Sequence, residues 1–385
     1  LHLDGYASGT ARRYIRAAVH LGLWVDTINC LIEDLNEEFL AMFVSHLPNC
    51  ACTRASKDKS PDIIIGAQHF LNHLRRLRVI RRKKDERFQS PCKPLFENFC
   101  KWMQQHRGVT DRTLEIYRPA VVDLINKLGD NPNQYQARDL RCFVFDRLKQ
   151  SGRGKGKNTV SALRMFLRFL SAEGLCSVDL HYGIPRLADW RLSSLPRYLQ
   201  SVDVERVINT CDTDTPIGLR DRAILLLLAR LGLRGGDIAG MKLNDIDWTE
   251  ASIRFLGKGR YENRLPLPQE IGDAILKYLQ DSRPSVNDDH VFIRAIAPLR
   301  GFDSGSTVSR IVAKAIRKAG IKAPSFGAHV LRHSAATAML RQGVSLNDIA
   351  AILRHRSIET TAHYAKVDLA LLCEVAQPWP EVEPC

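Results

Sequence analysis

Apolar residues recur every three or four positions in several stretches of the first half of the chain. Two of these stretches are "TARRYIRAAVHLGLWV" (residues 10–25) and "RTLEIYRPAVVDLINKL" (residues 112–128), and each also carries a Thr and a Tyr four residues apart. Because an α-helix has 3.6 residues per turn, this period places the apolar side chains on one face. The pattern therefore predicts two amphipathic helices that resemble one another.

The similarity continues downstream of both stretches in the same order. The further pairs of similar stretches are 33–47 with 137–148 and 69–77 with 165–175. All four have a helical period, and we expect the small differences in spacing to lie in loops. Generic amphipathic helices would give a similar pattern. We interpret the order as an internal repeat of two small helical modules.

The second half of the chain has a different pattern. Residues 202–211 and the strongly apolar residues 219–233 predict two helices, whereas "ASIRFLGKGRYENRLPLP" (residues 251–268) alternates like two strands joined by a Gly-rich turn. Further helices follow, separated by glycines. The chain is thus predicted to be mainly α and multidomain, with a mixed α/β, mostly helical last domain that contains a small β-hairpin sheet. The expected segments are a helical module (1–80), a basic linker (81–91), a second helical module (92–182), a linker (183–198), the last domain (199–376) and a tail (377–385).

Composition narrows the class of partner. The 385 residues carry a formal net charge of +14, which favours a polyanion such as nucleic acid because bound phosphates release counterions. The most apolar run, residues 223–229, is too short to cross a bilayer, so we expect no membrane segment. Ten scattered cysteines suit reduced thiols. These features predict a cytoplasmic protein.

One group of residues could be considered as a metal site. His46, Cys50 and Cys52 lie close together in the sequence. They lack the paired Cys-x-x-Cys spacing of structural zinc sites. We therefore expect ordinary helix-end and loop residues there, with no metal and no cofactor.

Two basic stretches are candidates for DNA contacts. "RRLRVIRRKKDER" (residues 75–87) reads first as a solvated linker, although in a basic chain it could also follow a DNA backbone. "SGRGKGKNTV" (residues 151–160) lacks the Gly-Lys-Ser/Thr ending of a nucleotide-binding loop and opens a predicted helix, where backbone amides and cations suit phosphates. A flexible loop is the alternative. The candidate DNA-binding residues are Arg81, Arg82, Lys83, Arg153, Lys155 and Lys157.

Six polar residues of the last domain stand in informative places. Each of them alone has an ordinary explanation, such as a helix cap, a solvated lysine or a buried histidine. His329 and Arg332 share a helix face, since residues three apart are neighbours on a helix. The six positions are Arg234 in "LGLRGGD", Lys258 in "GKGR", His329 and Arg332 in "HVLRH", His355 in "LRHRS" and Tyr364 in "TTAHY".

In this order, the six positions resemble the tyrosine recombinase (phage integrase) family over about residues 92–376. The resemblance implies that the second helical module is a SAM-like core-binding domain that clamps DNA, and that the last domain is catalytic. Two departures are visible. Arg354 stands where the family usually has Gly before the last His, and the module at 1–80 does not resemble the small arm-binding domain of phage integrases.

The chemistry of these residue types is consistent with that resemblance. Two guanidiniums, of Arg234 and Arg332, match the geometry of phosphate oxygens. A phenol with a pKa near ~10 is a weak nucleophile, so Tyr364 needs a proton acceptor, for which we choose His329. We expect His355 to contact the phosphate and Lys258 to protonate the departing 5′-oxygen.

The resemblance further implies a 3′-phosphotyrosine intermediate that needs neither metal nor ATP. The adjacent residue His333 is expected to point elsewhere, as a structural hydrogen bonder.

The resemblance also implies partners and rival functions. The expected partner is double-stranded DNA, bound by a homotetramer on two sites, with room for a partner recombinase. The expected function is site-specific recombination of a mobile element by integration, excision or resolution. One alternative is a type IB topoisomerase, which relaxes supercoils with similar chemistry. Another is a catalytically silent DNA-binding protein. The intact set of six residues argues against this alternative.

Overall fold

The computed structural model describes residues 1–50, 61–80, 94–150, 152–185, 187, 195–256, 262–355 and 358–366. The chain divides into two compact units, Leu1–Arg16 with Arg191–Cys385 and Ala17–Trp190. Helices dominate throughout, and the few strands form one small sheet, as the hydrophobic pattern predicts.

The N-terminal helices are α1 (Ser8–Thr27), α2 (Glu37–His46) and α3 (Pro61–Arg76), with short 3-10 turns η1 (Ile32–Asp34) and η2 (Leu47–Asn49). Their apolar faces meet in one core that includes Leu21, Trp24, Phe43 and Leu71. The side chain of Asn36 accepts hydrogen bonds from the amides of Glu38 and Phe39, which caps the start of α2. We call residues 8–80 the first module.

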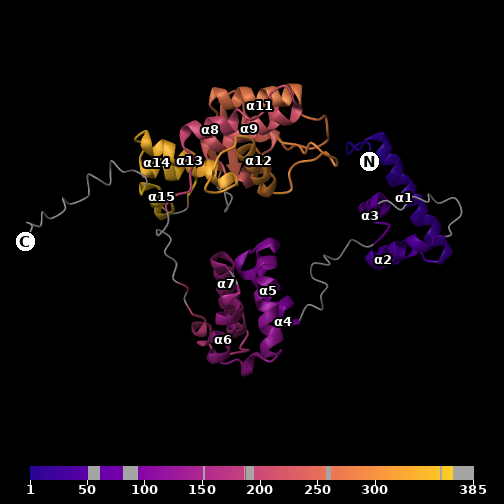
Figure 1. The fold of residues 1–385 in the computed structure, drawn as a ribbon. Helices are drawn as coiled ribbons and strands as arrows, with labels where there is room; N and C mark the ends of the chain where they lie inside the picture. The colour runs from indigo at the N-terminus through magenta and orange to yellow at the C-terminus, as the bar shows by residue number, and fades with distance from the viewer. Residues whose placement is uncertain are drawn as a thin grey trace, which may run out of the picture. The chain divides into compact units, whose positions relative to one another are not determined.

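The second group of helices is α4 (Pro94–Arg107), α5 (Asp111–Leu128), α6 (Ala137–Lys149) and α7 (Arg153–Ala172), with 3-10 turns η4 (Pro132–Gln134) and η5 (Leu180–Gly183). In Figure 1 α5 and α7 lie side by side, and they contact one another along their length. Phe96, Phe99 and Phe166 fill the core between the helices. We call residues 94–185 the second module.

Local structure agrees with the repeat in the sequence. Each module has a helix, a 3-10 turn, two extended residues and another helix, so that η1 precedes α2 as η4 precedes α6. Leu35 and Tyr135 occupy the same place after these turns, and both are buried. The predicted helices are confirmed in both modules, and α4 is an additional helix of the second module.

The C-terminal unit is built around the apolar helix α9, which contacts α11 and α13. Almost all of the leucines of α9 are buried, which explains its continuous apolar run. The helices of this part are α8 (Ser201–Ile208), α9 (Pro216–Leu231), α10 (Gly235–Ala239), α11 (Gln269–Asp281), α12 (Gly305–Lys318), α13 (Ala328–Arg341), α14 (Leu346–Ile352) and α15 (Ile358–Ala365), with a 3-10 turn η6 (Leu243–Asp245).

The small sheet has the strands β1 (Ile246–Asp247), β2 (Ser252–Leu256) and β3 (Glu262–Pro266) in the order β1-β2-β3. All pairs are antiparallel, and Ile253 pairs with Leu265 across the predicted hairpin. Its apolar residues on one face join the main core. The tip of the hairpin, with Lys258, lies outside the described residues.

At one end of this unit α13, α14 and α15 pack together, as Figure 1 shows in orange and yellow. A small separate core of Ala336, Leu340, Ile349, Leu353 and Tyr364 holds them. None of the helices in the described part of the chain is long and apolar enough to span a membrane.

Candidate active site

Arg234 follows directly after the end of α9, as the sequence predicts. Gly232 closes that helix with a positive φ of 60°, and a Cβ there would lie 2.5 Å from the side chain of Leu353. The chain then turns into α10, with Arg234 at its N-cap position. The Arg234 Nη2 donates a hydrogen bond of 2.7 Å to the carbonyl of Arg354.

Arg332 is buried on α13, with only 4% of its surface exposed. Its two terminal nitrogens donate to the carbonyls of Gly232 and Leu353, the latter at 2.5 Å. These carbonyls lie at the ends of α9 and α14, where helix C-termini carry partial negative charge. Burial, together with the neighbouring Arg234, lowers the Arg332 pKa to about 10, so the side chain remains a cation at neutral pH.

The turn after α14 supplies two of these acceptor carbonyls. The amide of His355 donates to the carbonyl of Ala350 at 2.9 Å and the amide of Arg354 to that of Ala351 at 3.0 Å, which is the Schellman pattern. This pattern requires a left-handed residue, and Arg354 adopts it with a φ of 53°. We call residues 353–355 the α14 turn. Its left-handed conformation is therefore kept although glycine is absent.

The side chain of Arg354 offsets the strain of that conformation, which costs about 1–2 kcal/mol for a residue with a Cβ. It forms an ion pair with Asp237 of α10. Its guanidinium also lies 4.4 Å from the ring centre of Phe255 on β2, a cation–π contact. The turn is thus fastened both to α10 and to the sheet.

His355 continues from this turn toward α15. Its Nδ1 lies 2.8 Å from the hydroxyl of Thr361, and its ring is nearly parallel to that of Tyr364 with 6.4 Å between centres. Burial and the positive charges of Arg332 and Arg234 lower the His355 pKa to about 4. The imidazole is therefore neutral at physiological pH, and Thr361 fixes its orientation.

Tyr364 lies in the small core with 2% of its surface exposed. Burial raises its pKa to about 12, against an opposing effect of Arg332. Its hydroxyl is 2.8 Å from Nδ1 of His333. The pKa of His333 is lowered to about 4 by burial and by its histidine neighbours, so this ring is neutral. In the tautomer protonated at Nε2, Nδ1 accepts the hydrogen bond from the phenol.

His333 is a hydrogen bonder, as expected, but the expectation that it points away from the other singled-out residues is wrong, because its partner is Tyr364. α13 is buried on most of its circumference, including Leu331, Arg332 and Ser334, so neighbouring positions on this helix both face the interior. A separation of 31 residues from Tyr364 hides the contact in the sequence. In the sequence, the only indication of a role for His333 is that it directly follows Arg332 and stands four residues after His329.

His329 stands in the first turn of α13 and is exposed. Partial burial of the ring and the charges of Arg332 and Arg234 lower its pKa. Because these two guanidiniums act on His329 and on His355 alike, the two arginines and both histidines share one electrostatic environment. The structure thus brings together five of the six predicted residues, and the sixth, Lys258, lies outside the described residues.

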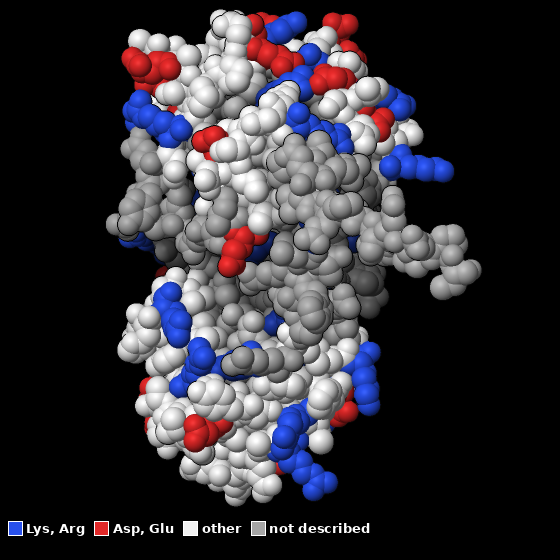
Figure 2. Space-filling model, turned by 90° about the vertical axis from the view of Figure 1, so that its left-hand side faces the viewer, with Lys and Arg blue, Asp and Glu red and all other residues white. Residues whose placement is uncertain are grey.

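The predicted DNA contacts of the second module are only partly described. α7 begins at Arg153 and has no acidic residue in its first turn, and Lys155 and Lys157 are exposed there. In Figure 2 Lys and Arg side chains predominate on the visible face of the second module, the lower body. The side chain of Arg153 and the residues Arg81, Arg82 and Lys83 lie outside the described residues.

Two groups of side chains have the composition of a metal site in the described part of the chain. In one, Asp288 accepts hydrogen bonds from the amides of Gly301 and His290 and pairs with the His290 ring, while Asp289 pairs with Lys242. These carboxylates already fasten the loop that carries them. The other group is His20, His46 and Cys50, in the first module.

Known proteins resemble this chain over most of its length. The family model described as "Phage integrase family" matches residues 197–370. The protein y4rA of Sinorhizobium fredii, whose name describes an integrase/recombinase, is 35% identical over 98% of this chain and 91% of its own length. Tyrosine recombinase XerD of Listeria monocytogenes is 29% identical over 73% of this chain and 96% of its own length.

Solved structures have the same fold. XerH site-specific recombinase bound to a palindromic difH substrate, in a post-cleavage complex, matches with a TM-score of 0.56 and 16% identity, over 98% of this chain and 99% of that one. A lambda integrase tetramer bound to a Holliday junction matches with a TM-score of 0.56 and 17% identity, over 85% of this chain and 91% of that one.

Proposed function

Because this chain belongs to the phage integrase family of tyrosine recombinases, we propose that Tyr364 attacks a DNA phosphodiester held by Arg234 and Arg332. One observation carries the proposal: both guanidiniums are fastened to carbonyls of the α14 turn, and the next residue of that turn, His355, stacks on Tyr364. A single turn thus fixes the phosphate-binding cations relative to the nucleophile.

The arginines act on the phosphate. Attack builds negative charge on the nonbridging oxygens, and preorganised cations stabilise it because they need no reorganisation during the reaction. His329 is exposed at the start of α13, where the helix N-terminus also favours an anion. A phosphate at this position would meet His329, the first amides of α13 and the two guanidiniums together.

His333 is the proton acceptor that we assign to the nucleophile, in place of His329. The neutral ring lies 2.8 Å from the hydroxyl of Tyr364, which is hydrogen-bond distance. As the bond between the phenolic oxygen and phosphorus forms, the phenol proton passes to Nδ1. Tyr364 is 2% exposed, so binding of DNA must first uncover its hydroxyl.

Lys258 is the proton donor that we assign to the leaving group. The bond between phosphorus and the 5′-oxygen breaks, and the oxygen takes a proton from the ammonium. Phe255 on β2 contacts Arg354 in the α14 turn and precedes Lys258 by three residues. Three extended residues span at most about 11 Å, which supports a position for this lysine near the phosphate.

The second module is the DNA clamp in this proposal. Residues 94–185 contain 14 Lys and Arg against 9 Asp and Glu. Lys155 and Lys157 at the start of α7 would bind backbone phosphates together with the free amides of that helix end. We further propose that four protomers act on two DNA sites, with the residues from Val367 onward packing against a neighbouring protomer.

A suicide substrate, nicked close to the crossover site mapped on the native replicon, tests this function. The nick lets the short cleaved fragment diffuse away, so the expected product is a covalent protein–DNA complex that resists denaturation. Transfer of the strand to a second duplex indicates recombination, whereas relaxation of supercoiled plasmid without transfer would indicate a topoisomerase. Binding without either product would contradict the assigned chemistry.

The assembly is tested by truncation after Lys366. The shortened chain should bind a single site as the full chain does, because the second module and the catalytic residues remain. The pairing of two DNA sites in one complex (synapsis), measured by a gel mobility shift, should be impaired. Full recombination by the truncated chain would exclude the proposed role of the last residues.

A further inference from the structure

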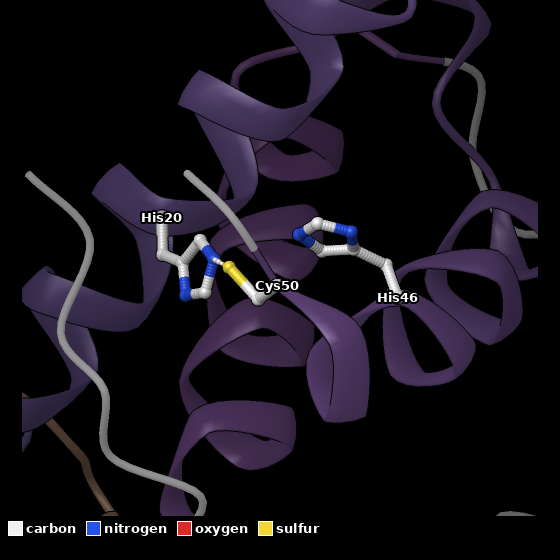
Figure 3. Close-up of side chains that lie close together, drawn as sticks. All are labelled: His20, His46 and Cys50. Carbon is white, nitrogen blue, oxygen red and sulfur yellow. Dashed lines mark hydrogen bonds between the residues drawn. The ribbon is translucent and has the colours of Figure 1, made fainter. Parts of the chain in front are cut away.

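Three potential metal ligands converge in the first module. His20 comes from α1, His46 is the last residue of α2, and Cys50 follows η2. Figure 3 shows the thiol of Cys50 between the two imidazole rings. The His20 Nε2 lies 3.2 Å from the Cys50 Sγ, and the nearest ligand atoms of all three residues lie within 4.8 Å of one another. Their arrangement adds His20 to two residues that are close in the sequence.

Burial of His20 calls for an explanation. Its side chain is 2% exposed, and its Nδ1 finds no hydrogen-bond partner among the described residues. Phe43 packs edge-on against the ring at 5.2 Å between centres. The ring is thus held in an apolar wall with its Nε2 next to the Cys50 thiol, which presents that nitrogen as a metal ligand.

The donor set and its spacing fit zinc. Zn²⁺ accepts imidazole nitrogen at ~2.0–2.1 Å and thiolate sulfur at ~2.3 Å in a tetrahedron, so neighbouring ligand atoms stand roughly 3.3–3.6 Å apart. The separation between His20 and Cys50 is close to this value. His46 lies at a helix end and is partly exposed, with its ring against Trp24 and Phe43, and its ligand nitrogen lies within 4.8 Å of the other two ligand atoms.

We propose that His20 Nε2, a ring nitrogen of His46 and the Cys50 thiolate bind one Zn²⁺ ion, with a water molecule in the fourth position. On binding, the Cys50 thiol releases its proton to solvent and the sulfur–zinc bond forms. The ion ties the end of α2 and the residues after η2 to α1. The site is structural, because these helices carry none of the residues assigned to DNA cleavage.

Cobalt(II) is the probe for this site, since it takes zinc ligands and reports them by colour. The full-length chain is stripped with a chelator, dialysed and titrated with Co²⁺. One equivalent should produce visible absorption and a thiolate-to-metal charge-transfer band, and Zn²⁺ should displace it. Cys50→Ser should lose the charge-transfer band and weaken binding at least about 10²-fold, because it removes a ligand rather than a supporting residue.

Cys30→Ser is the matched control. Cys30 lies in the same module, and its Sγ donates to the carbonyl of Leu31 at 3.4 Å, away from the cluster. This variant should bind Co²⁺ as the wild-type chain does. His46→Gln is a second test variant, at a partly exposed helix end. It should weaken binding without loss of helical circular dichroism.

Thermal unfolding gives an independent reading. Zn²⁺ should raise the unfolding temperature of the wild-type and Cys30→Ser chains but not of Cys50→Ser or His46→Gln. Equal Co²⁺ spectra for wild type and Cys50→Ser, or no binding by the wild type at micromolar Co²⁺, would overturn the proposal and leave a thiol–imidazole hydrogen bond. Neither readout involves DNA, so the result is independent of the recombinase function.

Discussion

The chain has two groups of histidines whose neighbours differ in charge. We call His329, His333 and His355, to which the proposed function assigns roles in DNA cleavage, the catalytic cluster, and His20 and His46 with Cys50 the thiol cluster. Burial lowers the pKa of His20 as it does those of the catalytic cluster. The charge of Arg332 helps to lower the pKa of each histidine in the catalytic cluster. For His20 the pKa is lowered by burial and then by another histidine, His46.

This difference determines which ligand each group can bind. Neutral imidazoles beside two guanidiniums favour an anion, because the fixed charges repel a metal cation and attract a phosphate. Two imidazoles beside a thiol favour a cation, because the thiol becomes a negative ligand when its proton leaves. Burial lowers the pKa of His20 and of the three histidines of the catalytic cluster alike, and the charge of their neighbours separates their chemistry.

Replacing Tyr364 by Phe should have the largest effect. The variant lacks the nucleophilic oxygen, so covalent attachment to a suicide substrate should be abolished. DNA affinity should stay within a few-fold, since phosphate contacts dominate it. The Co²⁺ spectrum of the thiol cluster should be unchanged, which would separate the two groups functionally. A normal yield of covalent complex on a denaturing gel would remove the central assignment.

Lys258→Ala should slow cleavage of ordinary DNA by about 10²- to 10⁴-fold, because an alkoxide leaves poorly without a proton. A substrate with sulfur at the 5′-bridging position should be cleaved at nearly the wild-type rate, since a thiolate leaves unprotonated. Arg234→Ala serves as the comparison and should not be rescued, as its charge acts on the nonbridging oxygens. If Lys258→Ala slowed cleavage of both substrates equally, the lysine would only position the DNA and would not be the proton donor.

His333→Ala should slow cleavage by about 10²-fold if the ring accepts the phenol proton. His329→Ala should have a smaller effect on the cleavage rate and a larger one on substrate binding, since its exposed ring faces the phosphate position. Single-turnover kinetics on the suicide substrate separate the two quantities. If His329→Ala proves the slower variant at saturating substrate, the acceptor is His329, as the sequence motif suggests.

The catalytic cluster should also make stability depend on pH. The pKa values of His333 and His355 are about 4 in the folded chain, below the value of ~6.5 for free histidine. Between these values the unfolded chain binds more protons, so the free energy of unfolding decreases as pH falls from ~6.5 toward 4 and is undiminished above that range.

Urea denaturation at pH 7 and pH 5 measures this slope. His333→Gln should lose less stability than the wild type over this interval, since one of the two groups no longer titrates. An identical pH dependence in both chains would mean that folding does not shift the pKa of His333. The same comparison with and without Zn²⁺ tests whether a bound metal protects the thiol cluster from acid.

Arg354 should give the smallest effect. Arg354→Ala keeps a Cβ in the left-handed turn and loses the ion pair and the contact with Phe255, so it should destabilise the chain. Arg354→Gly loses the same contacts but relieves the backbone strain. It should therefore be more stable than Arg354→Ala by about 1 kcal/mol in urea denaturation. Equal stability would mean that the turn opens when the arginine is removed.

Periodicity in the sequence was sufficient to predict the helices and the two strands of the hairpin, β2 and β3. A helix needs only local neighbours to form its apolar face, and α1, α5 and α9 lie where that face predicts them. The motifs of the residues that we propose as catalytic could also be recognised in the sequence, because Arg332 and Tyr364 stand in distinctive local contexts. Lys258 remains a prediction from such a context.

Contacts between distant segments could not be read from the same patterns. The pairing of His333 with Tyr364 and that of His20 with Cys50 join residues about thirty positions apart. The acceptors that hold Arg234 and Arg332 are backbone carbonyls, which every residue has and no motif reveals. Such interactions depend on how the helices pack against one another.

The α14 turn has a consequence for how the gene can change. Leu353 and Arg354 supply carbonyls to the two arginines, and His355 stacks on the tyrosine that follows. A change of side chain in this turn alters one contact, as with Arg354 in place of glycine. Insertion or deletion of a single codon between Leu353 and His355 would move every one of these groups at once. Natural variants of this enzyme should therefore carry amino-acid substitutions in the α14 turn but no insertions or deletions.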